Sequence, residues 1–233
     1  MAHKRQFVVQ SEDIIALLAG IGCALSTTPI NNADIEYTLY KASEEGITKL
    51  DFRILGLIVQ WVEVHESYIN QPRLLRFLLK TNSYQSRVFL FWKAIAQWRK
   101  SNRKWSNFIK KKNSIELLER FDLLPVGTDF QIQRKGEDHR FINTILRIPM
   151  GLLRIRDGDI LEKEQMVQIH KTYENRVRFG VCLRADLWSF LEQDDQISPS
   201  QLAKFVGCAF SSAWEVKQDY HLWKQSVPVL VHK

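Results

Sequence analysis

Four side chains near the C-terminus have the chemistry and the spacing needed to contact the edges of nucleic-acid bases. They are Ser211, Trp214, Glu215 and Gln218. They recur at i, i+3, i+4 and i+7, which is one stripe along an α-helix. A glutamine amide can pair with adenine, a carboxylate can accept a hydrogen bond from cytosine, and a hydroxyl can serve either role. Because only one face of a helix enters the major groove, this stripe is a candidate for base contacts.

The residues around the stripe predict two short helices joined by a tight turn. Ser198 and Pro199 stand in the order favoured at a helix start, and Gly207 permits the positive φ of a sharp turn. We expect helices over residues 199–206 and from about 210 to 220. The positions expected to face inward are Leu202, Ala203, Val206, Cys208, Ala213, Val216 and Tyr220.

Residues 183–220 resemble the three-helix core of the helix-turn-helix and winged-helix DNA-binding superfamily. The resemblance rests on the segment PSQLAKFVGCAFSSAWEVKQDY and on the helix LRADLWSFLEQ before it. It implies sequence-specific binding to duplex DNA, often in a transcription regulator. In winged-helix relatives a β-hairpin wing follows, for which residues 227–231 could supply a strand. The nearby Lys204 and Lys217 are candidates to hold phosphates.

The excess positive charge of the chain lies outside this segment. The net charge is +7 over 233 residues. Residues 1–121 contain 18 Lys and Arg against 11 Asp and Glu, whereas the remaining residues contain 15 of each. Residues 181–233 hold five basic and six acidic side chains. Because phosphate attraction supplies much of the affinity for DNA, the helix pair would need cations from elsewhere.

One segment of the first half concentrates these cations. Residues 98–113, WRKSNRKWSNFIKKKN, carry seven basic side chains and no acidic one. The periodicity predicts an amphipathic helix with a basic face that follows a phosphate backbone. The candidate backbone contacts are Arg99, Lys100, Arg103, Lys104, Lys110, Lys111 and Lys112. A solvated surface and a helix lying on a membrane surface are the alternatives.

The distribution of apolar residues, glycine and proline predicts a mainly α fold in three parts. These are a basic helical bundle over residues 1–121, a loop-rich mixed α/β segment over 122–177 and the helix-turn-helix module over 178–233. A weaker helix-turn-helix pattern lies at 50–98. Within these parts we expect a helix over residues 34–43 closed by Gly46, and short strands or irregular structure at 129–133 and 145–148.

The apolar run at residues 14–25 is too short to span a bilayer, so we expect a buried helix and a cytoplasmic location.

Catalytic patterns are weak. No phosphate-binding glycine loop, zinc-protease motif or nucleophile elbow occurs, and no cofactor is implied. The three consecutive residues Glu137, Asp138 and His139 resemble a set of metal ligands. Residues 129–135 resemble the carboxylate-and-lysine arrangement of metal-dependent nucleases, but they have a glutamine where a second acidic residue is needed. Three dispersed cysteines predict neither a disulfide framework nor a zinc site.

These patterns favour a DNA-binding protein, as in bacterial transcription regulators, over an enzyme. The main alternative is a protein-interaction adaptor or an antitoxin-like partner in which the helix-turn-helix is scaffold and Trp214 anchors an interface. Homodimerisation is compatible with either function. Association with RNA through the basic segment and exposed aromatic side chains is a third hypothesis.

Overall fold

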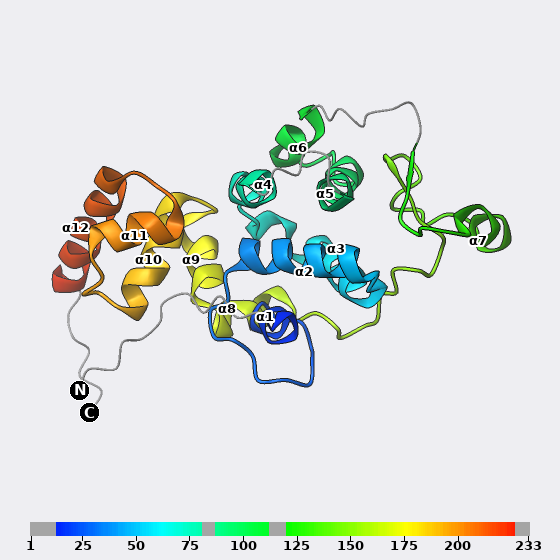
Figure 1. Cartoon of the computed structure of the whole chain (residues 1–233). Coiled ribbons are helices and arrows are strands. Elements are labelled where there is room, and N and C mark those ends of the chain that lie inside the picture. The colour runs from blue at the N-terminus through cyan, green and yellow to red at the C-terminus, as the bar shows by residue number, and fades with distance from the viewer. Residues whose placement is uncertain (1–12, 81–86, 112–119, 227–233) are drawn as a thin grey trace. The chain divides into compact units, whose positions relative to one another are not determined.

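The computed structural model describes residues 13–80, 87–111 and 120–226, and the fold is mainly helical (Figure 1). Helix makes up 64% of the structure, and the sheet found in the described residues has two parallel strands. The mainly α class expected from the sequence is therefore confirmed. None of the described helices is both long and apolar enough to cross a membrane.

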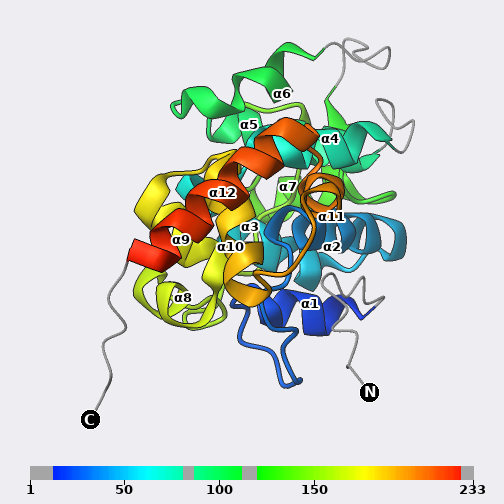
Figure 2. The ribbon, with the colours of Figure 1, turned by 90° about the vertical axis from the view of Figure 1, so that its left-hand side faces the viewer.

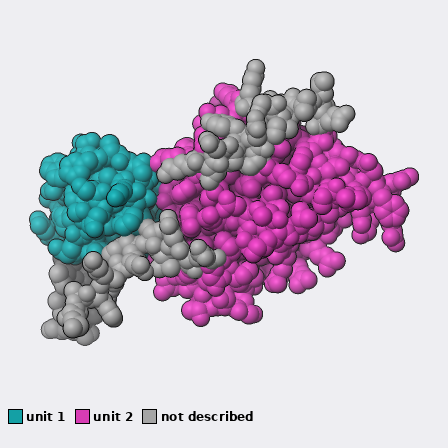
Figure 3. Space-filling view, in the orientation of Figure 1, with its two compact units in different colours: residues 1–10, 163–233 teal, residues 11–162 magenta. Residues whose placement is uncertain are grey.

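The chain forms two compact units that divide between Glu162 and Lys163 (Figure 3). In chain order, we call residues 13–162 the first unit (magenta, labelled unit 2 in Figure 3) and residues 163–226 the second unit (teal, labelled unit 1). The sequence placed its boundaries at 121/122 and 177/178 instead. The mixed segment up to Glu162 thus belongs with the helical bundle, and the residues after it belong with the C-terminal helices.

The first unit is built from seven α-helices in the described residues, two 3-10 helices and two short strands. In chain order these are α1 (Ile14–Gly20), α2 (Ile35–Lys49), α3 (Phe52–His65), η1 (Glu66–Tyr68), α4 (Gln71–Lys80), α5 (Arg87–Trp98), η2 (Arg103–Trp105), α6 (Ser106–Lys110), β1 (Phe121–Asp122), α7 (Thr128–Lys135) and β2 (Leu146–Arg147). Strand β1 pairs with β2 in parallel, with Phe121 opposite Leu146.

Aspartate caps define where three of these helices begin. Asp13, Asp34 and Asp51 precede α1, α2 and α3, and each carboxylate accepts at least one hydrogen bond from a backbone N–H group of the first turn. Such caps satisfy donors that lack a partner inside the helix. The buried helix expected near the N-terminus is α1, in which Leu17 and Leu18 are fully buried.

Helix α2 does not stop at Gly46, as the sequence suggested, but continues to Lys49. Gly46 is buried, and a Cβ atom there would lie 2.7 Å from the side chain of Leu55 on α3. The glycine therefore allows two helices to approach closely rather than ending one. The chain leaves α2 at Leu50, which adopts a left-handed backbone with φ of 55°.

Tryptophan side chains fill the centre of the first unit and tie its segments together. Trp61, Trp92 and Trp105 are fully buried. The indole N–H of Trp61 donates to the carbonyl of Ile21 at 2.8 Å, and that of Trp92 donates to Ser43 at 2.9 Å. Large aromatic side chains bury much apolar area. The polar atoms of Trp61 and Trp92 are satisfied by these partners, whereas the buried indole N–H of Trp105 has no partner among the described residues.

Segment 129–133 is helical, so the strand or irregular structure expected there is wrong. It forms part of α7, which begins after Gly127 and whose outer side chains include the exposed Phe130. The strand expected at 145–148 is confirmed in part, as β2. Alternating apolar residues over five positions do not distinguish a strand from a short helix on a surface.

The acidic residues of the suggested metal and nuclease patterns are bound to arginines. Glu137 pairs with Arg120, Asp138 with Arg140, and Asp129 with Arg147. Residues that could hold a metal ion do not cluster anywhere in the described ranges.

The free thiol of Cys23 offers a test of this core. Burial, followed by the nearby charge of Asp159, raises the pKa of Cys23 to about 12, whereas Cys182 and Cys208 are partly exposed. The thiolate is the reactive form, so at pH 8 Cys23 should be nearly inert. We expect Ellman's reagent to modify two thiols quickly in the folded protein and the third only after denaturation. The Cys23→Ala variant should keep the fast phase intact. Equal rates for all three thiols would contradict this packing.

Candidate nucleic-acid interface

The second unit consists of five helices in the described residues. They are α8 (Lys163–Ile169), α9 (Lys171–Phe179), α10 (Leu183–Gln193), α11 (Pro199–Val206) and α12 (Phe210–Ser226). Figure 2 shows α12 as the long outer helix of this unit, with α10 behind it. Helix α12 is longer than expected from the sequence, since it runs past Tyr220 to Ser226.

A single apolar cluster holds α10, α11 and α12 together. Its buried members are Leu187, Trp188, Leu191, Ile197, Leu202, Val206, Ala213, Val216 and Tyr220. Ala203 and Cys208 pack against it and are partly buried. The inward positions expected on the two last helices are therefore confirmed, with Ala203 and Cys208 at the edge of the core rather than inside it.

The start of α11 carries a capping box. The Ser198 hydroxyl accepts a hydrogen bond from the backbone N–H of Gln201, and the Gln201 side chain accepts one from the backbone N–H of Ser198, both at 3.2 Å. Pro199 occupies the first helical turn. This arrangement satisfies orphan donors from both directions and fixes the beginning of the helix.

The turn between α11 and α12 is three residues long and depends on Gly207. Its φ is 73°, in the left-handed region, and its N–H bonds to the carbonyl of Ala203 at 2.9 Å. The N–H of Cys208 bonds to the same carbonyl at 3.0 Å. A non-glycine residue in this conformation would be strained. The turn closes α11 and places the first residue of α12 at Phe210.

The four candidate base-contacting residues, Ser211, Trp214, Glu215 and Gln218, all lie exposed on α12. Trp214 has 49% of its surface exposed and is not part of the buried cluster. Because Ala213, Val216 and Tyr220 point into the core, helical periodicity turns the four residues away from it. The structure therefore brings these four side chains onto one outer face.

The two candidate lysines of this unit differ in their surroundings. Lys204 on α11 is exposed and forms no ion pair with the residues described. The ammonium of Lys217 donates to the carbonyl of Ile197 at 2.7 Å, just before α11 begins. Lys217 thus helps to fasten α12 to the loop that precedes the cap, whereas Lys204 is open to solvent.

Other basic side chains at the surface of the second unit form ion pairs with acidic side chains. Arg184 pairs with Asp219 at 2.8 Å, and Lys224 pairs with Asp195. The hydrogen bond from Lys224 lowers the pKa of Asp195 and raises that of Lys224. Such exposed pairs stabilise the fold little, but they neutralise cations that would otherwise face a polyanion.

Helix α9 is fixed to α10 by buried polar groups, which explains why the second unit begins before residue 178. The Arg176 guanidinium contacts Asp186 at 2.9 Å. The Asn175 amide donates to Ser189 at 3.2 Å and to Glu192 at 2.9 Å. Nothing in the sequence spacing indicated these pairs, because their partners lie on different helices.

The basic segment of the first unit is not the continuous helix expected from its periodicity. Helix α5 ends at Trp98, a turn follows, and the chain resumes as η2 and the short α6. The Asn102 side chain accepts a hydrogen bond from the N–H of Lys104 and starts η2. Asparagine competes in this way for backbone donors that a helix would use. The single basic stripe predicted along residues 99–112 is therefore wrong.

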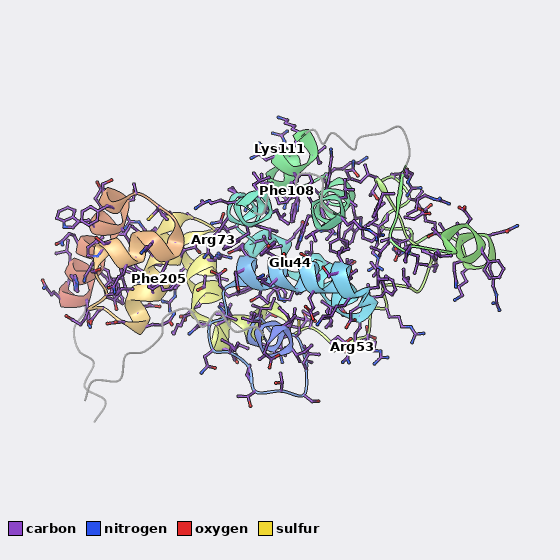
Figure 4. The ribbon with its side chains drawn as sticks, viewed as in Figure 1. Glu44, Arg53, Arg73, Phe108, Lys111 and Phe205 are labelled. Atoms are coloured by element: carbon purple, nitrogen blue, oxygen red, sulfur yellow. The ribbon has the colours of Figure 1, made fainter. Side chains whose placement is uncertain are left out.

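The cations of this segment have separate surroundings. Arg99 forms a 2.5 Å contact with Glu66, and this hydrogen bond raises the pKa of Arg99. Lys111 follows the last residue of α6 and is partly buried (Figure 4). Its backbone carbonyl accepts a hydrogen bond from the ammonium of the buried Lys93 at 3.0 Å. The exposed cations are Lys100, Arg103, Lys104 and Lys110. Lys112 lies outside the described residues.

The basic segment and the stripe on α12 belong to different units, so the two predicted contact regions are separate bodies. The suggested wing at residues 227–231 lies outside the described residues.

The weaker helix-turn-helix pattern at 50–98 corresponds to α3, α4 and α5. Residues 88–96 of α5 are all buried, so this helix has no outer face there with which to enter a groove.

Sequence reasoning missed the apolar end of α12. Leu222 and Trp223 are 68% and 44% exposed, and Phe210 at the helix start is 56% exposed. Phe210, Trp214, Gln218 and Leu222 follow one another at intervals of four residues, which places them along one side of the helix. The spacing of Leu222 from Trp214 would have indicated this side of the helix from the sequence, had the helix been predicted to extend past Tyr220.

Comparisons of the chain with protein-family models, curated proteins and solved structures found no match. The resemblance of residues 183–220 to the helix-turn-helix superfamily therefore stays a prediction that rests on the residues and on the geometry described above.

The capping box gives a quantitative test of how α11 is held. Replacing Ser198 by Ala removes the acceptor for the Gln201 N–H, and loss of a cap costs about 1 kcal/mol. We expect the free energy of unfolding of the second unit to fall by that amount in urea titrations followed by circular dichroism. Ser200→Ala changes an exposed serine on the same helix and serves as the matched control. An equal loss in both variants would show that the cap contributes nothing specific.

Proposed function

We propose that this protein binds duplex DNA and reads its sequence with the outer face of α12, as in a bacterial transcription regulator. One observation carries the proposal. Gly207 joins two helices through a three-residue turn, and the second helix buries Ala213 and Val216 while exposing polar side chains at the spacing of a recognition stripe. Helix pairs of this kind enter the major groove with the second helix.

Each exposed side chain has a defined role in this proposal. Gln218 pairs with adenine, Glu215 accepts a hydrogen bond from cytosine, and Ser211 contacts either base. Trp214 provides apolar contact beside them. Lys204, on the preceding helix, holds a phosphate and fixes the register of α12 on the duplex.

The second unit contains equal numbers of basic and acidic residues between 163 and 226, eight of each. Its attraction to phosphate is consequently small, and additional affinity must come from the exposed cations of the first unit. Lys100, Arg103, Lys104 and Lys110 fulfil this role in the proposal. Neutralising phosphates releases counterions, so the affinity should fall steeply as salt is raised from about 50 mM to about 200 mM.

Two variants separate specificity from general affinity. Gln218→Ala should reduce discrimination at a base pair by about 1–3 kcal/mol, because the bidentate contact is lost. The double variant Lys104→Glu/Lys110→Glu should weaken binding to every duplex alike, by on the order of tenfold. Fluorescence anisotropy with a pool of labelled duplexes measures both effects.

Lys135→Glu is the matched control, since it reverses an exposed lysine on α7 without touching the basic segment. No binding to any duplex at low salt would contradict the proposed function. Preferential binding to RNA of the same sequence would replace it by the RNA-associated alternative.

A second candidate function, association with protein, is favoured by the apolar residues of α12. Phe210, Trp214 and Leu222 expose large apolar surfaces on one side of a helix, and clustered exposed apolar side chains are typical of interaction sites. Trp is also frequent at the centre of interfaces. The simplest association of this kind is a homodimer through α12.

Sedimentation velocity tests the homodimer. Leu222→Asp places a charge on the apolar side of α12 and should shift the protein from dimer towards monomer, because burying the carboxylate is costly. Gln225→Asp introduces the same charge at another exposed position of α12 and should leave the sedimentation coefficient unchanged. A wild-type protein that sediments as a monomer at every concentration would contradict this second function.

A further inference from the structure

A pocket of about 490 Å³ lies in the first unit. Its lining comes from residues 138–140 and from residues between 150 and 156. Its volume falls within the range of roughly 300–1,000 Å³ that is common for small-molecule sites. The pocket is therefore large enough for a ligand the size of a nucleotide.

Three arginines line this pocket against a single carboxylate. Arg140 is buried and holds Asp138 through two contacts, at 2.9 Å from Nε and 2.5 Å from Nη2. This pairing neutralises the charge of the Asp138 carboxylate. Arg154 and Arg156 are exposed, and neither forms an ion pair with any residue in the described part of the chain. The pocket therefore has two guanidinium groups that are not neutralised.

Several other arginines in the described residues have carboxylate partners, whereas Arg154 and Arg156, like the exposed Arg53, Arg103 and Arg134, form no ion pair with the residues described. Arg73, Arg99, Arg120, Arg147, Arg176, Arg178 and Arg184 are all in ion pairs. Asp157 and Asp159, the nearest carboxylates along the chain, are not part of the lining. A pair of unneutralised guanidinium groups at a concave surface attracts anions.

The backbone that bears Arg154 and Arg156 is held firmly by its carbonyl groups. The carbonyl of Leu153 accepts a hydrogen bond from Arg140 Nη2 at 3.0 Å, and that of Arg156 accepts one from Gln60 at 2.8 Å. A Cβ atom on Gly56 would lie 2.8 Å from the carbonyl oxygen of Arg154, so α3 approaches this segment closely. Two guanidinium groups are thus carried by a positioned backbone rather than by a loose loop, which lowers the entropic cost of holding a ligand.

The same pocket has an apolar component. Met150 and Ile155 line it and are exposed, although both are large apolar side chains. Apolar lining beside a few polar groups is the usual composition of a site for an organic ligand.

We propose that this pocket binds a small phosphorylated ligand of the nucleotide class. Arg154 and Arg156 hold the phosphate, because a guanidinium presents two parallel N–H donors that match its oxygens. Met150 and Ile155 contact the flat apolar part of the ligand. The inference goes beyond the DNA-binding function and does not depend on it, because none of the residues that line the pocket has a role in the proposed DNA contact.

Isothermal titration calorimetry with adenosine 5′-monophosphate tests the proposal, with adenosine and inorganic phosphate as partial ligands. We expect saturable binding of the monophosphate, weaker binding of inorganic phosphate and the weakest binding of adenosine. The Arg154→Gln and Arg156→Gln variants should each weaken binding of the monophosphate roughly tenfold, since each removes a charge-assisted contact. Higher salt should weaken it further.

Arg134→Gln is the matched control, because Arg134 is an exposed arginine on α7 that does not line the pocket. It should bind the monophosphate as the wild type does. Melting curves establish that each variant remains folded. Absence of saturable binding to the wild type, or equal affinities for the wild type and the Arg154→Gln/Arg156→Gln double variant, would overturn the proposal. Loss of duplex DNA binding in that double variant, with no binding of the monophosphate to the wild type, would overturn it as well and assign the arginines to the DNA backbone.

Discussion

The left-handed backbone of Gly207 is the constraint on which the arrangement of the second unit depends. It ends α11 after two turns and allows α12 to begin three residues later. The apolar side chains of both helices then meet α10 in one cluster. Once Ala213, Val216 and Tyr220 are committed to that cluster, the helical period alone decides which residues face solvent. The identity of the outer face is thus a consequence of the turn and the core together.

The chemistry of that outer face is mixed, and this is why two functions compete for it. Gln218, Glu215 and Ser211 have the donors and acceptors that distinguish base edges. Phe210 and Leu222, on the same helix, have only apolar surface to offer. Surface ion pairs such as Arg184 with Asp219 further reduce the free positive charge. A DNA-binding role therefore requires cations from the first unit, whereas association with protein requires none.

Both units also bury charge in pairs, as Arg176 with Asp186 does in the second unit, and the first unit has several such pairs. Arg73 of α4 binds Asp34 and Glu36 at the start of α2, and Glu36 also accepts a hydrogen bond from the backbone of Asn70. Figure 4 shows Arg73 between these helices. A buried charge without partners would be strongly destabilising, so each such group fixes the positions of its neighbours. Arg140 with Asp138 is a second case, and there the pair also forms part of the pocket lining.

The sequence by itself determined the features that arise from neighbouring residues. It predicted the mainly α class, the cap at Ser198, the turn at Gly207 and the inward stripe of α12, since each follows from local geometry and helical period. It did not predict that Asn102 interrupts the basic helix, that Gly46 lies inside α2, or that Arg176 binds Asp186. Tertiary structure alone brought residues 138–140 and 150–156 together into one pocket and left Arg154 and Arg156 without carboxylates. Pairing across helices depends on contacts between residues far apart in the chain, and spacing along one segment contains no information about them.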